Sequence, residues 1–182
     1  MLKAQNMATK ATIHKVLLNI ANMDSHYYAE HNLTLAKHPS ETDLRLMVRL
    51  IAFVLNADDD LVFTKGISQD DEPDLWKKSL AGDIELWIDL GQPDEKRIKK
   101  ACGRSKEVII YTYQEGMAKS WWKSIETSLT RFSNLRVVYL ESDSDIEVLA
   151  KRAMNLQANI LDSELTLIDD THSILLKEQE WM

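Results

Sequence analysis

The sequence predicts an α/β fold in which helices flank a mixed β-sheet. Helical and extended segments alternate in the second half of the chain, as they do in α/β layers. In the first half two extended segments follow each other directly, which requires an antiparallel pair, so the sheet should contain both strand directions. The 182 residues suit one domain and include no repeat or linker. We therefore expect a single domain over 1–182, with 1–9 as a loose leader.

The first elements predicted are two strands and a helix. Residues 10–22 and 27–37 have the composition of strands and are joined by a polar turn. The strongest helix signal follows: Pro39 and Ser40 supply a stop and an N-cap, and Asp43 supplies a short-armed capping-box acid. Apolar side chains then occupy most of the helix circumference. We expect this helix to be central and covered on more than one side.

The later elements alternate between strands and helices. In chain order we expect a strand at 61–67, a short apolar segment after 74, an acidic strand at 83–91, a helix that begins at Pro93, a strand in KEVIIYTY, a helix in EGMAKSWWKSIETSLTRF, a strand in NLRVVYLE, a helix over 143–155 and a closing hairpin that turns near Asp162 and Ser163.

Composition limits the compartment and the chemistry. The single cysteine, Cys102, excludes a disulfide framework and is expected to be a buried, inert thiol. No apolar run is long enough to span a membrane and no signal-peptide core is present, so we expect a cytoplasmic protein. The net charge of −7 argues against coating of nucleic acid through overall charge, although a local basic patch stays open. No glycine-rich phosphate loop is found.

The stretch DIELWIDLG, residues 83–91, places apolar and acidic side chains on opposite faces of a strand. Apolar residues alternate with Asp83, Glu85, Trp87 and Asp89. Ordinary polar alternation on a solvent-facing strand gives this pattern, and so does a strand whose acidic face has a chemical role. The neighbouring segments bear on the choice because they also carry acids.

Acidic residues begin the first predicted helix and precede the acidic strand. Glu41 opens the helix, and Asp74 follows Pro73 between two strands. Hard divalent ions bind carboxylates that converge from different elements, and such ions activate water for phosphodiester hydrolysis. Pro73-Asp74, fourteen intervening residues and the tripeptide DLG at 89–91 resemble the signature of the PD-(D/E)XK nucleases. That resemblance implies a restriction-endonuclease-like core with extra N- and C-terminal strands.

Gly91 departs from this signature, which expects a lysine two residues after the second acid. A basic residue of the following helix would have to orient the nucleophile or stabilise the developing charge. Lys99 and Arg97 flank the apolar face of that helix, so Lys99 is the predicted replacement and Arg97 the reserve. We also expect Arg45, Arg97 and Lys100 to contact phosphates. Alternatively, the basic run of this helix is its solvated side.

The sequence as a whole resembles the YaeQ family of small bacterial proteins. The likeness covers the chain from about residue 10 nearly to its end. It rests on LTLAKHPSETDLRLMVRLIAFVLNA, FTKGISQDDEPDLW and IELWIDLGQPDEKRIKKAC, and more weakly on VIIYTY, WW and LQANI. The resemblance implies the nuclease-like fold more firmly than it implies a reaction.

Carried over position by position, the resemblance implies that Glu41, Asp74 and Asp89 form a site for Mg²⁺ or Mn²⁺. Glu72 and Glu85 are nearby substitutes. Glu85 and Asp89 lie roughly 13 Å apart along a strand, so one ion cannot bind both.

Two functions follow, and the sequence leaves both open. In the first, the protein is a metal-dependent phosphodiesterase that cleaves DNA or RNA, with Lys99 assisting the attacking water. In the second, it is a catalytically inactive binding or regulatory module for nucleic acid or a protein partner, and Gly91 marks the lost reaction. Carboxylates that converge on one pocket favour the enzyme. Carboxylates neutralised by Arg45 and Arg49, which share a helix face with Glu41 at four-residue spacing, favour the module.

Overall fold

The computed structural model describes residues 10–65 and 71–182. Within them lie ten strands, three α-helices and one 3₁₀-helix. In chain order these are β1 (Thr12–Asn22), β2 (Tyr27–Lys37), α1 (Asp43–Leu55), β3 (Leu61–Phe63), β4 (Leu75–Lys78), β5 (Ile84–Leu90), α2 (Glu95–Arg104), β6 (Ser105–Thr112), α3 (Glu115–Leu129), β7 (Leu135–Ser142), the 3₁₀-helix η1 (Ile146–Leu149), β8 (Ala153–Leu161), β9 (Glu164–Ile168) and β10 (Ser173–Glu180).

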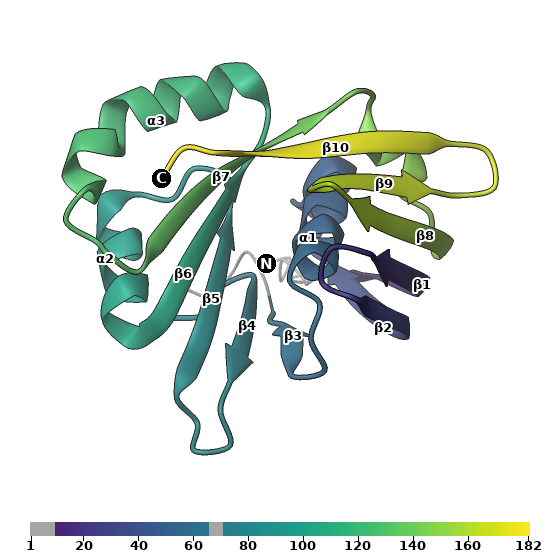
Figure 1. The fold of residues 1–182 in the computed structure, drawn as a ribbon, viewed down its shortest axis with the longest axis horizontal. Helices are drawn as coiled ribbons and strands as arrows, with labels where there is room; N and C mark the ends of the chain where they lie inside the picture. Colours follow the sequence, from purple (N-terminus) through teal and green to yellow (C-terminus); the bar gives the residue numbers. More distant parts are fainter. Residues whose placement is uncertain (1–9, 66–70) are drawn as a thin grey trace, which may run out of the picture.

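All ten strands belong to one mixed sheet in the order β2-β1-β8-β9-β10-β7-β6-β5-β4-β3. The pairs β1/β8, β5/β6 and β6/β7 are parallel, and the other pairs are antiparallel. The sheet curls around α1 and nearly closes on itself, so that it is barrel-like, with β2 and β3 at its two ends (Figure 1). Strands from both ends of the chain therefore enclose the same helix.

Helix α1 lies inside this curve, which confirms the prediction of a central helix. Every residue from Leu46 to Val54 is buried, including Arg49. One core cluster joins these side chains to inward-facing residues such as Leu18 of β1 and Ile109 of β6. Because sheet surrounds the helix on several sides, apolar residues are required around most of its circumference.

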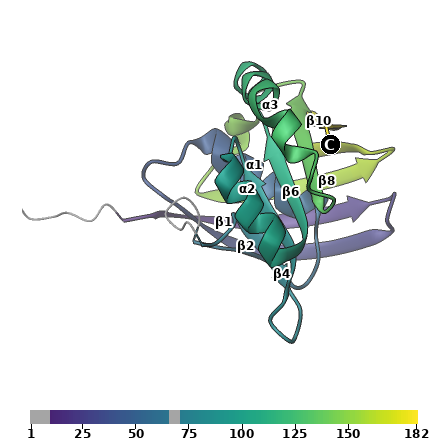
Figure 2. The ribbon, with the colours of Figure 1, turned by 90° about the vertical axis from the view of Figure 1, so that its left-hand side faces the viewer.

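Helices α2 and α3 cover only the outer face of β5, β6 and β7 (Figure 2). A second core cluster joins Ile98 and Ala101 of α2 to Trp87, Val108 and Val137 of these three strands. The three strands are buried on both faces, as parallel strands require. Trp87 is thus a core residue on the same face of β5 as the acids.

The predicted fold class, a helix-flanked sheet with a PD-(D/E)XK core, is wrong. The protein instead has a nearly closed ten-stranded sheet around one helix, with two further helices on one outer side. Periodicity in the sequence identifies buried residues but not the strands that pair. The parallel pairing of β1 with β8 joins Lys15 to Ala153, and no local pattern predicts such a distant contact.

Several elements also differ from their predicted bounds. The helix predicted over 143–155 is the short 3₁₀-helix Ile146–Leu149, followed by β8 from Ala153. Strand β10 was not predicted, whereas the hairpin turn at Asp162 and Ser163 is confirmed by their positive φ angles. The end of the strand predicted at 61–67 and the predicted leader 1–9 lie outside the described residues. Among the described helices, none is long and apolar enough to span a membrane.

Substitution of Thr42 by alanine tests where α1 begins. The Thr42 hydroxyl accepts a hydrogen bond from the Arg45 N–H at 3.1 Å, so Thr42, and not the predicted Ser40, is the N-cap. We expect Thr42→Ala to lower the free energy of unfolding in urea by about 1 kcal/mol. Ser40→Ala is the matched control and should change it little, because Ser40 contacts His38 outside the helix. Equal losses in the two variants would contradict this assignment.

Candidate functional site

The three predicted metal ligands are buried side chains on adjoining elements. Glu41, Asp74 and Asp89 are only 5%, 4% and 1% exposed. Asp74 immediately precedes β4, and its backbone N–H donates to the Ile88 carbonyl at 2.9 Å. One carboxylate oxygen of Asp74 accepts a hydrogen bond from the Leu90 N–H at 3.0 Å. The side chain of Asp74 is therefore fixed to the backbone of β5.

Two arginines of α1 neutralise Glu41 and Asp74. Arg45 lies 2.6 Å from Oδ1 of Asp74 and 3.2 Å from Oε1 of Glu41. Arg49 donates from Nη2 to Oε2 of Glu41 at 3.0 Å and to the Ala36 carbonyl at 2.9 Å. Its Nε also lies 2.8 Å from Oε1 of Glu41, close enough for an ion pair although the N–H has no hydrogen-bond alignment. The four-residue spacing seen in the sequence thus brings the side chains of Glu41, Arg45 and Arg49 together.

Arg97 of α2 neutralises Asp89 through both carboxylate oxygens. Nε donates to Oδ2 at 2.8 Å and Nη2 donates to Oδ1 at 2.7 Å. The same Nη2 donates to the Glu72 carbonyl at 2.8 Å. This bidentate geometry is the strong form of an arginine–carboxylate contact. Arg97, the reserve candidate for the missing lysine, thus binds the acid it was expected to assist.

We call these six residues the ion network: Glu41, Arg45, Arg49, Asp74, Asp89 and Arg97. Burial raises the pKa of Asp89 above its usual value, and the hydrogen bonds from Arg97 oppose this shift without cancelling it. Burial lowers the pKa of Arg49 despite the charge of Glu41. Burial also opposes the charge of Arg45, but Asp74 and then Glu41 outweigh it and raise its pKa. With three carboxylates and three guanidiniums, the network is balanced in charge.

The predicted lysine lies outside the ion network. Lys99 is exposed on α2, whereas Lys100 forms a close ion pair with Asp71. Of the substitute acids, Glu85 lies 3.3 Å from Lys106, and Glu72 contributes its carbonyl to Arg97. The roles predicted for these side chains stay predictions, but only Arg45 and Arg97 among the proposed basic residues reach the acids.

Gly91 occupies the position at which the nuclease signature expects lysine, and its role here is in the backbone. Its φ angle is +88°, in a region that L-residues rarely adopt. A β-carbon at Gly91 would meet no atom within 4 Å, so the conformation and not the space favours glycine. The Gly91 N–H donates to the Tyr111 carbonyl at 2.9 Å. The end of β5 therefore turns sharply after Leu90.

The acids as arranged do not fit a metal ion. Both carboxylate oxygens of Asp89 accept hydrogen bonds from Arg97. One carboxylate oxygen of Asp74 accepts a hydrogen bond from Arg45, and the other accepts one from a backbone N–H. Over residues 10–65 and 71–182, no group of three or more His, Cys, Asp or Glu side chains could hold an ion. Cys102, predicted to be a buried thiol, is half-buried, and this partial burial raises its pKa to about 11, as expected of an unreactive thiol.

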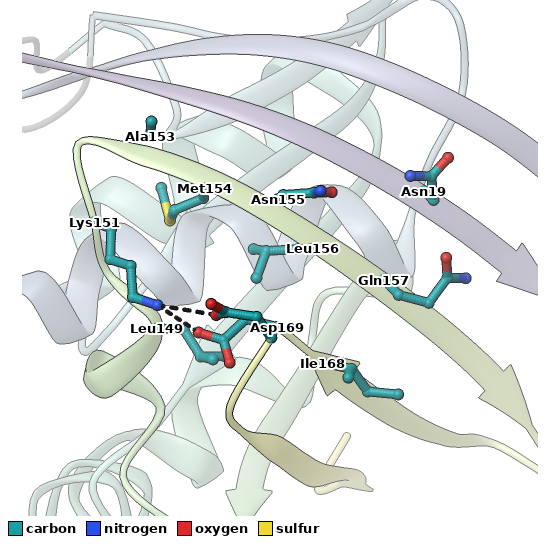
Figure 3. Close-up of a pocket in the computed structure, with 11 residues that line it drawn as sticks. Asn19, Leu149, Lys151, Ala153, Met154, Asn155, Leu156, Gln157, Ile168 and Asp169 are labelled. Carbon is teal, nitrogen blue, oxygen red and sulfur yellow. Dashed lines mark hydrogen bonds and ion pairs between the residues drawn. The ribbon is translucent and has the colours of Figure 1, made fainter.

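A pocket of about 470 Å³ is lined by β8 together with residues of β1, η1 and the end of β9 (Figure 3). No residue of the ion network lines it. At one end of the pocket Lys151 forms ion pairs with Asp169 at 2.9 Å and with Asp170 at 3.4 Å. The carboxamides of Asn19, Asn155 and Gln157 lie along its upper wall. None of the predicted site residues lines this pocket.

The protein thus has one sheet and two balanced parts of the ion network: Glu41, Arg45, Arg49 and Asp74 lie between α1 and the β4–β5 region, and Asp89 and Arg97 lie between β5 and α2. The family described as "YaeQ protein" matches residues 7–178, and the chain belongs to that family. It is 42% identical to "Uncharacterized protein YaeQ" of Escherichia coli strain K12 and 41% identical to the protein of that name from Salmonella typhi. Each match spans 96% of this chain and 98% of the relative.

Two solved structures have the same fold. YaeQ protein from Xanthomonas axonopodis pv. citri has a TM-score of 0.90 at 47% identity, with 94% of this chain and 98% of that chain covered. YaeQ protein from Pseudomonas syringae has a TM-score of 0.89 at 28% identity, with 94% and 96% covered. These comparisons confirm the predicted family, and none of these names mentions a nuclease or a metal.

The stability of a Glu41→Gln variant tests the ion network. The Arg49 side chain is 2% exposed, and loss of the Glu41 carboxylate removes the carboxylate that its guanidinium contacts. We expect the free energy of unfolding to fall by about 3–5 kcal/mol. The matched control is Glu115→Gln, which removes a carboxylate from an exposed ion pair with Lys119 and should leave stability nearly unchanged. A loss for Glu41→Gln as small as that of the control would refute the proposed role of Glu41.

Proposed function

We propose that this protein binds the phosphate backbone of nucleic acid through the exposed basic side of α2. The observation that carries the proposal is the run from Lys96 to Lys106, which contains six basic residues and no acidic residue. The exposed members on α2 lie away from the buried Ile98 and Ala101: Lys96 and Lys100 are opposite them, and Lys99 and Arg104 are at the flanks. They are Lys96, Lys99, Lys100 and Arg104. We call these four the basic side of α2.

The charge of this surface contrasts with the rest of the chain. The whole chain has a net charge of −7, so a concentrated basic segment produces a local field of opposite sign. Phosphate contacts from lysine and arginine supply most of the affinity in binding that does not depend on base sequence. A local patch of this kind supports contact with a backbone and not the recognition of bases.

Asp71 contacts two members of the basic side and marks where a phosphate would lie. Its carboxylate pairs with Lys100 and lies 3.8 Å from Arg104. The Asp71 side chain is 75% exposed, and exposed ion pairs contribute little to stability. A phosphate oxygen can therefore replace this carboxylate at low cost.

The ion network supports this function by fixing α2 in place. Arg97 lies between the exposed lysines and points inward to Asp89 and the Glu72 carbonyl. A helix that is held at its first turns presents its basic side chains in one orientation, which reduces the entropy lost on binding. The metal-dependent nuclease stays a prediction of the sequence. The carboxylates of Asp74 and Asp89 already have partners in Arg45, the Leu90 N–H and Arg97.

Fluorescence anisotropy tests the proposal with labelled 20-nucleotide single-stranded DNA, RNA of the same sequence, and the DNA duplex. We expect micromolar binding at low salt that weakens as salt is raised. Reversal of two charges, Lys96→Glu with Lys99→Glu, should weaken binding at least ~10-fold and lower the salt slope by about 1–2. The matched control reverses Lys119 and Lys123, which are exposed on α3, and should bind nearly as well as the wild type.

Two results of this experiment count against the proposal. Absence of binding at low salt would contradict the proposal and favour a protein partner. Equal losses in the α2 and α3 variants would show that overall charge, and not the basic side of α2, controls binding. The same mixtures with Mg²⁺ or Mn²⁺, separated on a denaturing gel, should contain intact nucleic acid. Cleavage that disappears in Asp89→Asn would support the nuclease instead.

A further inference from the structure

The two ends of the sheet differ in how they are protected from pairing. At one end, β3 has three residues, and its neighbour β4 contains an irregularity between Lys77 and Lys78. At the other end, β2 has eleven residues that pair with β1 in one uninterrupted register. Short strands, bulges, prolines and lysines are the usual ways in which proteins protect a sheet edge.

Strand β2 has almost none of these protections. Between Tyr28 and Ala36 it contains no proline and no lysine, and Glu30 is its one charged residue. Over the described ranges, no strand pairs with the outer edge of β2, which ends the sheet order. The inward-facing ring of His31 packs against Phe53 of α1, so the strand is anchored from inside, while no described strand pairs with its outer edge.

The backbone geometry shows which residues face that edge. The Lys15 N–H donates to the Arg152 carbonyl just before β8. The backbone N–H and C=O groups of odd-numbered residues in β1 therefore point to β8, and those of even-numbered residues point to β2. The register pairs these with odd-numbered residues of β2, so the even-numbered ones point their N–H and C=O groups outward. The Ala36 carbonyl also points away from β1, since it accepts a hydrogen bond from Arg49. The remaining edge residues are Tyr28, Glu30, Asn32 and Thr34, whose side chains are all exposed.

We infer that β2 is a dimerisation edge, which pairs antiparallel with β2 of a second copy of this chain. A two-fold axis at His31 places Glu30 of each copy opposite Asn32 of the other, and Tyr28 opposite Thr34. No two carboxylates and no two lysine or arginine side chains meet in this register, and at the axis His31 lies opposite His31 of the second copy. Each of the four edge residues donates and accepts one bond, so the pairing forms about eight backbone hydrogen bonds. The contact uses the same surface twice and closes after two copies.

The self-complementary register favours a second copy over an unrelated extended peptide. Glu30 opposes a neutral amide, the exposed Tyr28 ring covers the Thr34 methyl group, and all four edge residues are used. A shift of the axis by one residue to Asn32 would oppose Tyr28 to Ala36, whose carbonyl already has Arg49 as a partner. Of these two registers, the one with its axis at His31 uses all four edge residues and leaves the Ala36 carbonyl to Arg49.

Sedimentation velocity of the wild type at about 1–100 µM tests this inference. We expect the mass to reach twice 20.9 kDa at the upper end of this range. Asn32→Glu places like charges at both Glu30 contacts and should raise the dissociation constant ~10-fold or more, whereas Asn32→Lys places opposite charges there and should not raise it.

Asn32→Pro provides a test through the backbone. The Asn32 N–H faces away from β1, so proline removes an intermolecular bond without removing a bond of the fold. We expect this variant to be monomeric with an unchanged circular dichroism spectrum, and Asn32→Ala to dimerise like the wild type. A wild type that stays monomeric at 100 µM, or Asn32→Glu and Asn32→Lys variants with equal dissociation constants, would overturn the inference.

Discussion

The buried guanidinium of Arg49 constrains the whole structure, because it places a positive charge in the middle of the helix that the sheet encloses. A charge in such a position needs a partner, or its desolvation cost is not offset. Glu41 supplies that partner from just before the same helix. The Ala36 carbonyl supplies a second contact from β2. The first turns of α1 are therefore tied to the end of β2 by polar contacts in an apolar surrounding.

The other two arginines of the ion network, Arg45 and Arg97, meet the same requirement that a buried charge has a partner. Arg45 connects Glu41 to Asp74, and Asp74 accepts from the N–H of Leu90 in β5. On the other face of β5, Asp89 forms an ion pair with Arg97 of α2. Of the acids that alternate along β5, Asp89 is explained by Arg97 of α2, whereas Glu85 pairs with Lys106. A balanced network of this kind determines geometry more than it adds net stability.

The sequence identified the buried helix, the acids and their helix-face spacing, because these depend on local periodicity. It indicated the pairing of Glu41 with Arg45 and named Arg97 as a side chain near the acids. It could not identify Arg97 as a bidentate partner of Asp89, since that contact depends on how α2 crosses β5. It also could not predict the closure of the sheet, because residues of β1 and β8 pair across most of the chain. The turn at Gly91 needed the backbone angle that only the structure provides.

Isothermal titration of Mn²⁺ into the wild-type protein tests the central claim, that arginines and not a metal ion neutralise the three buried acids. Asp74→Asn and Asp89→Asn variants, checked for folding, serve as the comparison. We predict no heat of binding up to millimolar Mn²⁺ in any of the three proteins, because the carboxylate oxygens already have partners. Micromolar binding to the wild type that is lost in both variants would contradict the claim and restore the metal site.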